Sequence, residues 1–314
     1  MNKLFKLLFL LFIISSFLFS CKRESLPYQY KTKNVIVVII DGARYAETWG
    51  DSTHQYIPEM ANQMSEYGII NKEFYNNGPT YTLAGHTALT TGFYQEINNS
   101  GVEIPQYPSI FQYWQKQFQT NKDLSWIISS KDKLEILNNC QQTEWKGKNT
   151  PSVNCGINGN SSGYREDSIS FRKLIEVLNT RHPRLVLFSL RNPDYMAHTG
   201  IWENYIQGIK SSDTFAYLVW KYIRQDEFYK GNTTLFITND HGRHSDSIAD
   251  GFASHGDGCN GCRHIFLYAY GPDFKQGKII DNHRELTDIS ATIAELLHFK
   301  INYGNGSAMF ELFE

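Results

Sequence analysis

Three apolar, β-branched stretches of this sequence each run into an acidic residue, and a histidine follows two of those acids. Asp41 comes directly after the first stretch, Asp194 follows the second after a short link, and Asp240 closes the third. His198 lies four residues after Asp194, and His241 comes directly after Asp240. Carboxylate oxygens and imidazole nitrogens are the ligands of catalytic divalent ions such as zinc. The pattern therefore predicts a metal site assembled from distant parts of the chain.

The three stretches, residues 34–40, 185–190 and 233–238, have the composition of buried strands. The carboxyl ends of parallel strands lie at one edge of a sheet, where ligands bind, so the three acids are expected to meet there. Strand-like and helix-like segments alternate along the chain, which predicts a layered α/β domain with a central, mostly parallel sheet. The expected strands are 34–40, 124–129, 185–190, 233–238 and 264–270, and the expected helices are 59–67, 109–118, 168–179, 202–226 and 287–297.

A second group of candidate residues lies in segment 78–94. Thr80 or Thr82 supplies a hydroxyl at the start of a helix expected over residues 83–90. Backbone N–H groups at a helix N-terminus favour an anion there, although a threonine at this place is also an ordinary N-cap. Gly85, beside His86, would permit the close approach of a ligand.

The order of these motifs resembles the alkaline phosphatase superfamily, in particular its threonine-nucleophile phosphatases and nucleotide pyrophosphatase/phosphodiesterases. The motifs that carry the resemblance are Asp41-Gly42, the Thr82 segment, Asp194-x-x-x-His198, Asp240-His241-Gly242 and Ser254-His255-Gly256. The resemblance extends from about residue 34 to residue 297. It implies a three-layer α/β/α fold, which agrees with the alternating pattern of strands and helices.

The resemblance also implies a phosphoric ester hydrolase with a threonine nucleophile, Thr82, and two divalent metal ions, which we expect to be zinc. The implied ligands are Asp41, Asp240, His241 and the Thr82 oxygen for one ion, and Asp194, His198 and His255 for the other. One ion would lower the pKa of the threonine hydroxyl and the other would stabilise the leaving oxygen, so that a phosphothreonine forms and is then hydrolysed. Read singly, each ligand could instead be a helix cap or a hydrogen-bonded core residue, and Thr80 is the alternative nucleophile.

Two lysines, Lys131 and Lys133, follow the strand expected to end at residue 129. They resemble basic residues that face the substrate in monoester- and phosphonate-hydrolysing relatives, and a monoester dianion gives such residues more charge to compensate. The alternatives are a solvated loop with ordinary surface lysines and a phosphodiesterase. The diesterase pattern has an asparagine where Gly85 stands here, and Asn98 or Asn99 would have to supply the missing amide donor.

Two other classes of function are disfavoured by the sequence. A sulfatase would need a Cys-x-Pro-x-Arg or Ser-x-Pro-x-Arg segment from which formylglycine is made, and the chain has neither. A non-catalytic surface lipoprotein would be expected to have lost at least one metal ligand, yet all six side chains outside Thr82 are present.

The N-terminus is typical of a bacterial export signal. Lys3 and Lys6 precede an apolar stretch over residues 7–19, which is short for a membrane-spanning helix. Residues 18–21, Leu-Phe-Ser-Cys, resemble a lipobox, so we expect a signal peptide over 1–20, lipidation at Cys21 and a tether over 21–33. This predicts a lipid-anchored protein of the bacterial cell envelope, periplasmic or at the surface, whereas ordinary signal cleavage would leave Cys21 as a free thiol.

Charge and length limit the partners and the number of domains. Removal of residues 1–20 takes away two lysines and no acids, so Lys+Arg falls from 30 to 28 against 32 acids and the formal charge moves from −2 to −4. A mildly acidic chain argues against nucleic acid as the main partner. The expected partners are a small-molecule phosphate ester and the membrane reached through Cys21. Residues 34–314 are expected to form a single catalytic domain with a small irregular insertion around 138–163.

Four further cysteines, Cys140, Cys155, Cys259 and Cys262, form an even set, which predicts one or two disulfides in an oxidising compartment. The expected pairs are Cys140 with Cys155, bracing the irregular insertion, and Cys259 with Cys262. The Cys259-x-x-Cys262 pair could instead be redox-active, but it does not follow a βαβ start. A zinc knuckle would need a second cysteine pair at matching spacing, which the chain lacks.

Overall fold

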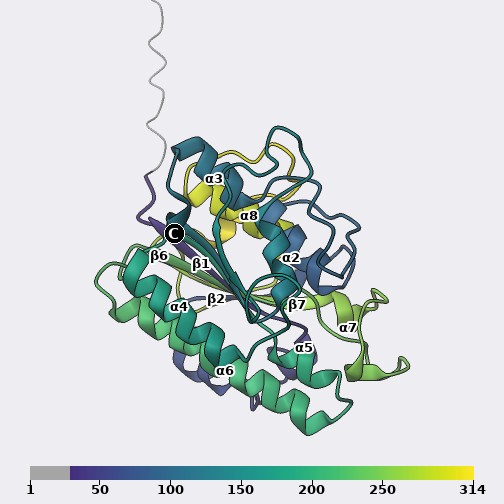
Figure 1. The fold of residues 1–314 in the computed structure, drawn as a ribbon. Helices are drawn as coiled ribbons and strands as arrows, with labels where there is room; N and C mark the ends of the chain where they lie inside the picture. Colours follow the sequence, from purple (N-terminus) through teal and green to yellow (C-terminus); the bar gives the residue numbers. More distant parts are fainter. Residues whose placement is uncertain (1–28) are drawn as a thin grey trace, which may run out of the picture.

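A nine-stranded, mostly parallel sheet lies between two layers of helices (Figure 1). The computed structural model describes residues 29–314, so the expected signal peptide over 1–20 and the expected lipidation site Cys21 lie outside the described residues. The α/β fold class expected from the sequence is confirmed. No helix within residues 29–314 is both long enough and apolar enough to cross a bilayer.

The strand order in the sheet is β4-β3-β5-β1-β6-β7-β2-β8, and β9 also pairs with β2. β7 runs antiparallel to both of its neighbours, β6 and β2, and the other pairs are parallel. The strands are β1 Asn34–Ile40, β2 Ile69–Tyr75, β3 Ser125–Ser129, β4 Ser152–Cys155, β5 Leu185–Leu190, β6 Thr233–Thr238, β7 His264–Tyr270, β8 Lys278–Ile280 and β9 Arg284–Glu285.

Helices α2, α3 and α8 cover one face of the sheet, and α4, α5 and α6 cover the other (Figure 1). Successive side chains of a strand point to opposite faces of the sheet. The side chains of β1 therefore pack alternately into two apolar cores, one on each face, and all seven residues are buried. This explains why the central strands are continuous apolar runs. The helices are α2 Thr82–Thr91, α3 Ile110–Phe118, α4 Asp167–Arg181, α5 Asn192–Ala197, α6 Trp202–Gln225, α7 Asn260–Arg263 and α8 Leu286–Leu296.

The five strands expected from the sequence are all present, and α3, α4, α6 and α8 correspond to four of the expected helices. The helix expected over 59–67 is instead a π-helical turn, Met60–Met64, followed by a 3-10 turn, Ser65–Tyr67. The backbone N–H groups of Glu59 and Met60 donate to the buried carboxylate of Asp213 on α6. That carboxylate binds the start of the segment in place of a regular helix cap.

The expected disulfides are wrong, because Cys140, Cys155, Cys259 and Cys262 are all free thiols. Cys140 and Cys155 are buried in the apolar core. Burial raises the pKa of both thiols, and that of Cys155 to about 12. Segment 138–163 is not wholly irregular either, since it contains the edge strand β4, which pairs in parallel with β3. The segment is therefore held by strand pairing and core packing rather than by a covalent link.

Candidate active site

The carboxyl ends of β1, β5 and β6 bring Asp41, Asp194 and Asp240 together. These strands are neighbours in the sheet, with β1 between the other two. Asp194 N donates to the carbonyl of Asp41 at 3.0 Å, and Gly42 N donates to Asp240 Oδ1 at 3.2 Å. Gly42 has φ +68°, and a Cβ there would lie 2.8 Å from that of Asp194. The turn after β1 can therefore pass this close to Asp194 only with glycine.

Asp41, Asp240 and His241 form a fully buried group whose ligand atoms lie within 4.8 Å of one another. His241 Nε2 is 3.7 Å from Asp41 Oδ1 and 3.5 Å from Asp240 Oδ2. Asp41 Oδ1 and His241 Nε2 have no hydrogen-bond partner. Burying such polar atoms without a partner is costly. These oxygen and nitrogen donors fit a divalent cation such as zinc.

His241 is held in the protonation state that a metal ligand needs. Its Nδ1 lies 2.7 Å from the carbonyl of Gly242. Because a carbonyl only accepts, Nδ1 carries the proton and Nε2 keeps a free lone pair. Burial lowers the pKa of His241 to about 3 despite the opposing charge of Asp240. The neutral imidazole thus presents Nε2 to the two carboxylates, as metal-ligating histidines do.

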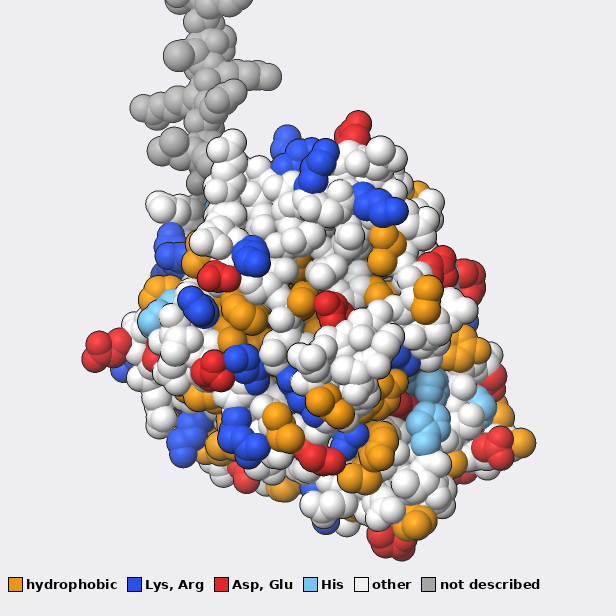
Figure 2. Space-filling model, in the orientation of Figure 1, with side chains coloured by type: hydrophobic (Ala, Val, Ile, Leu, Met, Phe, Trp, Pro, Cys, Tyr) orange, Lys and Arg blue, Asp and Glu red, His pale blue; other side chains and the backbone are white. Residues whose placement is uncertain are grey.

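Asp194, His198 and His255 form the second group. Asp194 Oδ1 lies 3.2 Å from His198 Nε2 and 3.3 Å from His255 Nε2. His255 is oriented by the carbonyl of Thr80, 2.9 Å from its Nδ1. His198, at the end of α5, is half exposed, and histidine side chains reach the surface where α5 and α7 lie (Figures 1 and 2). The ligand atoms of Asp194, His255 and His241 lie within 4.8 Å of one another, whereas His198 belongs to no such set of three among the described residues.

Lys131 connects both carboxylate groups to Thr82. Its Nζ lies 2.8 Å from Asp41 Oδ2 and 2.6 Å from Asp194 Oδ2, and it donates to Thr82 Oγ1 at 3.1 Å. The side chain is buried, which opposes its charge, but Asp194, Asp41 and Asp240 outweigh burial and raise the pKa of Lys131. A charged ammonium therefore lies against the hydroxyl that the sequence identified as the candidate nucleophile.

Arg243 is a second buried cation at Asp194. Nothing in the sequence pointed to it beyond its place directly after Gly242. Its Nη1 lies 2.5 Å from Asp194 Oδ1, and it also donates to the carbonyls of Phe252 and Ala253. Burial would raise the pKa of Asp194, but Lys131, the two histidines and Arg243 hold it well below its ordinary value. Asp194 is therefore an anion fixed by cations on several sides.

Thr82 is the first residue of α2, and Asn99 binds the start of this helix. Asn99 Oδ1 accepts from Leu83 N at 3.0 Å and from Lys133 Nζ at 3.0 Å. Asn98, the other candidate amide, instead uses its side-chain oxygen to accept from the backbone of its own turn. Of the two asparagines, Asn99 is the one that lies beside the candidate nucleophile.

Gly85 allows α2 to approach the end of β6. A Cβ at this position would lie 2.3 Å from the carbonyl oxygen of Asp240. The next residue, His86, bonds through Nδ1 to the carbonyl of Thr82 and through Nε2 to Ser189 Oγ. Backbone of the protein itself, rather than open space, therefore lies beside Gly85.

A cavity of about 350 Å³ opens at this group of residues. Burial and the charge of Lys131 lower the pKa of Lys133, on its wall, to about 8. The lining residues are Thr82, Asn99, Lys131, Lys133, Tyr164, Asp194, Tyr195, His198, Thr199 and His255. The cavity thus contains the candidate nucleophile, both candidate lysines and all three residues of the second ligand group.

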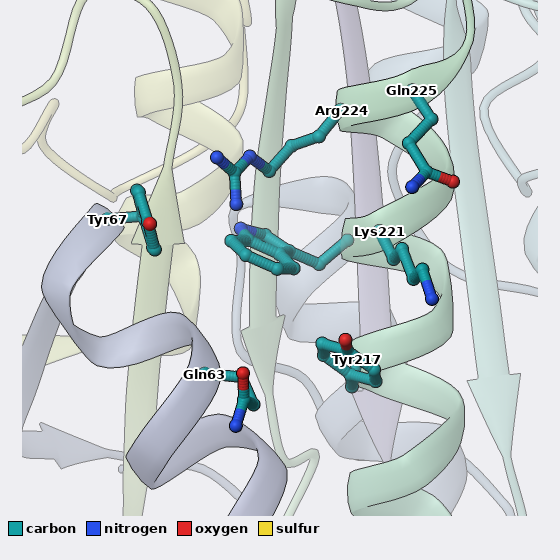
Figure 3. A pocket seen from close by; sticks show the side chains of 7 residues that line it. Gln63, Tyr67, Tyr217, Lys221, Arg224 and Gln225 are labelled. Atoms are coloured by element: carbon teal, nitrogen blue, oxygen red, sulfur yellow. The ribbon is translucent and has the colours of Figure 1, made fainter.

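A cavity of similar size, about 340 Å³, lies between residues 63–67 and α6 (Figure 3). The guanidinium of Arg224 lies 4.1 Å from the ring centre of Tyr67 and 4.3 Å from that of Trp220. Its lining has no carboxylate, histidine or cysteine. The candidate metal ligands therefore distinguish the first cavity, and not this one, as the candidate active site.

Comparisons with known proteins agree with this geometry. The sequence matches the metalloenzyme superfamily over residues 128–301, and no protein of curated function matches it. The phosphonate monoester hydrolase of Silicibacter pomeroyi has a similar fold, with a TM-score of 0.64 and 12% identity over 88% of this chain and 76% of the hydrolase.

Two other solved structures share the fold. The murine ectonucleotide pyrophosphatase/phosphodiesterase 5, an inactive threonine-to-alanine variant in complex with AMP, has a TM-score of 0.66 and 14% identity over 90% of this chain and 100% of that one. A sulfatase from a Pseudoalteromonas species has a TM-score of 0.62 and 14% identity over 88% and 71%.

Proposed function

Because the chain belongs to the alkaline phosphatase-like metalloenzyme superfamily, we propose that it is a metal-dependent hydrolase of phosphoric esters with Thr82 as its nucleophile. The observation that carries the proposal is the buried group of Asp41, Asp240 and His241, in which two ligand atoms have no hydrogen-bond partner. The Thr82 hydroxyl, on the wall of the cavity, is linked to this group by Lys131, whose Nζ donates to Thr82 Oγ1 and lies 2.8 Å from Asp41 Oδ2. In the murine relative, a threonine-to-alanine variant is inactive, which supports a threonine nucleophile on this fold.

Two divalent ions, which we propose to be zinc, would be held by two sets of side chains. The sets are Asp41, Asp240 and His241 with the Thr82 oxygen, and Asp194, His198 and His255. When bound, the ions supply Lewis acidity to the threonine oxygen and to the oxygen that leaves. The chain contributes imidazoles and carboxylates that burial and hydrogen bonds hold in place before an ion binds.

The proposed hydrolysis has two steps, formation of a phosphothreonine and its hydrolysis. Thr82 Oγ loses its proton and forms a bond to phosphorus as the bond from phosphorus to the alcohol oxygen breaks, and the alcohol leaves with a proton. Water then attacks the phosphothreonine, so that inorganic phosphate leaves and the Thr82 hydroxyl is restored. Lys131, 3.1 Å from Thr82 Oγ1, stabilises negative charge on that oxygen and on the transferred phosphoryl group.

We propose a phosphate monoester as the preferred substrate, with a diester as the alternative. The support is the pair of lysines on the cavity wall, because a monoester carries one more negative charge than a diester for them to compensate. Asn99 lies between Lys133 and the start of α2, where it would also contact a substrate oxygen. A second amide donor at Asn98 has no comparable support.

We also propose that the protein is lipid-anchored at Cys21 in the bacterial cell envelope. The support is the lipobox-like Leu-Phe-Ser-Cys sequence at residues 18–21. Labelling of cells with a lipid precursor, with Cys21→Ala as the control, tests this proposal separately from the activity.

The test of the function compares rates on an aryl phosphate, a bis-aryl phosphate and an aryl sulfate. The wild-type protein with bound metal is expected to hydrolyse the aryl phosphate fastest, and Thr82→Ala is expected to abolish that rate while retaining metal. Thr80→Ala is the matched control, since Thr80 is also a buried threonine, and should retain activity. Full activity of Thr82→Ala, or a preference for the sulfate, would overturn the proposal.

A further inference from the structure

A second cluster of metal-ligating side chains lies outside the candidate active site, formed by His244, Asp257, Cys259 and Cys262. The ligand atoms of His244, Asp257 and Cys262 lie within 4.8 Å of one another. The backbone N of Cys259 donates to Asp257 Oδ1 at 2.9 Å, which places Cys259 next to this group. Three of the four side chains therefore converge on a common point, and Cys259 lies beside them.

The fold brings this cluster together from two segments. Helix α7 starts directly after Cys259 and projects with its preceding loop at the edge of the molecule (Figure 1). Gly242 N donates to the carbonyl of Cys262 at 2.8 Å, and Arg243 N donates to that of Gly261 at 3.0 Å. This backbone pairing places His244 beside the end of the Cys-x-x-Cys segment.

His244 is oriented as a metal ligand is. Its Nδ1 lies 3.2 Å from the carbonyl of Ala249, so Nδ1 carries the proton and Nε2 keeps a free lone pair. Nε2 is buried and has no hydrogen-bond partner, although it lies 3.3 Å from Asp257 Oδ1. Nε2 and the Asp257 carboxylate therefore face each other, and a cation between them would be bound by both.

We propose that His244, Asp257, Cys259 and Cys262 bind a structural zinc ion. Two thiolates, one imidazole and one carboxylate complete a closed four-coordinate site, which is typical of structural zinc. Donors of a tetrahedral zinc lie roughly 3–4 Å apart, so the donors of His244, Asp257 and Cys262, which lie within 4.8 Å of one another, need only a small contraction. Cys259, which starts the same Cys-x-x-Cys segment, would supply the fourth donor. His244 and Asp257 thus take the places of the second cysteine pair that the sequence lacks.

Binding would release protons, because both thiols must ionise. The two protons pass to water, and no oxidant or reductant takes part.

The ion would hold both ends of loop 245–256, which connects His244 to Asp257. This loop carries His255, one of the proposed ligands of the active site, and it contains the carbonyls of Phe252 and Ala253 that bind Arg243. A zinc ion at the base of the loop would therefore hold His255 against Asp194. The zinc ion would thus have a structural role and would not contact the substrate.

Cobalt substitution tests the proposal without relying on activity. The full chain, purified without chelator or reductant, is loaded with Co²⁺ and its near-ultraviolet spectrum is recorded. Thiolate-to-cobalt charge transfer requires a cysteine ligand, and the proposed active-site ions have only oxygen and nitrogen ligands. We expect the charge-transfer band in the wild type and in Asp240→Asn. In Cys262→Ser we expect the band to disappear and the zinc content to fall by one equivalent.

Two further variants separate metal binding from folding. Asp257→Ala changes an exposed side chain, so it should fold normally while binding zinc at least about 10-fold more weakly. Cys140→Ser is the control, since Cys140 is a buried thiol elsewhere, and should keep the band. The proposal is overturned if the wild type shows no band, if Cys259 and Cys262 are found as a disulfide, or if Cys262→Ser leaves the zinc content unchanged. Because the spectrum reports only thiolate ligands, these outcomes do not bear on the proposed hydrolase.

Discussion

The imidazole rings of His241 and His255 stack with their centres 4.1 Å apart and their planes at 20°. The Nδ1 atom of each ring lies against a backbone carbonyl, that of Gly242 or Thr80, so both Nε2 atoms are available to the site. The two proposed ion sites therefore lie side by side, and a substitution at one should change metal binding at the other.

Asp240→Asn is expected to remove the ion of the first ligand group. An amide replaces one of the buried carboxylates around His241, so the site loses the charge that attracts a divalent ion. Changes even beyond the direct ligands cost about 10–100-fold in affinity or activity, and we expect the rate on an aryl phosphate to fall more than about 100-fold. Metal analysis and kinetics check this. Asp250→Asn, at an exposed position with φ +67° that asparagine tolerates, should change neither value.

Lys131→Ala is expected to slow monoester hydrolysis by about 10²–10³-fold, the usual effect of losing one preorganised charge-stabilising donor. Diester hydrolysis should slow less, because a diester has one charge fewer for Lys131 to compensate. The measurement is the ratio of the two rates, with the exposed Lys122→Ala as the control. An unchanged ratio would show that Lys131 does not select between the ester classes.

Asp213 should make the stability depend on pH. Burial raises its pKa from 3.8 to about 7, although the N–H groups of Met60 and Glu59 oppose the shift. The folded chain therefore binds more protons than the unfolded chain between these values, and the free energy of unfolding should fall as the pH rises from about 4 to about 7. Each pKa unit corresponds to about 1.4 kcal/mol, so the change amounts to a few kcal/mol.

Urea unfolding of the wild type and of Asp213→Asn at several pH values measures this effect. Asparagine can still accept from one of the two N–H groups but does not titrate. The variant should therefore lose most of the slope in this window, and an equal slope in both proteins would exclude Asp213 as its origin.

Cys140 and Cys155 should resist alkylation in the folded protein. Both are buried free thiols whose pKa values are raised by burial, and only the thiolate reacts. Mass spectrometry after treatment with iodoacetamide should find both unmodified until denaturant is added. A mass two hydrogens lower in the untreated protein, assigned to a bond between these two cysteines, would contradict the structure.

The sequence predicted the centre of the sheet well because β1, β5, β6 and β7 are continuous apolar strands buried on both faces. It did not predict β2, whose sequence IINKEFY places polar residues in the middle and whose pairing with β7 shifts register between Asn71 and Phe74. The edge strand β4 was missed because its four residues lie within a polar segment.

The candidate site was predictable as far as its residues follow strand ends. Asp41, Asp194 and Asp240 are placed by strand order, which a parallel sheet dictates. Arg243 could not be recognised, because its contact with Asp194 depends on how the chain turns after Gly242. The partnership of His244 with Asp257 and the two cysteines was also hidden, since it arises from backbone pairing between segments about 20 residues apart.

The position of β1 between β5 and β6 has a consequence for the order in which the chain folds. β1 ends at residue 40, but its neighbours begin only at residues 185 and 233. Contacts between such distant segments form slowly, because the entropy cost of closing a long loop comes before the contacts stabilise the chain. During synthesis β1 therefore cannot pair with both of its neighbours until the chain has been made as far as β6. Binding of a metal ion by Asp41, Asp240 and His241 would report that β1 has paired with β6, the strand that Asp240 and His241 follow.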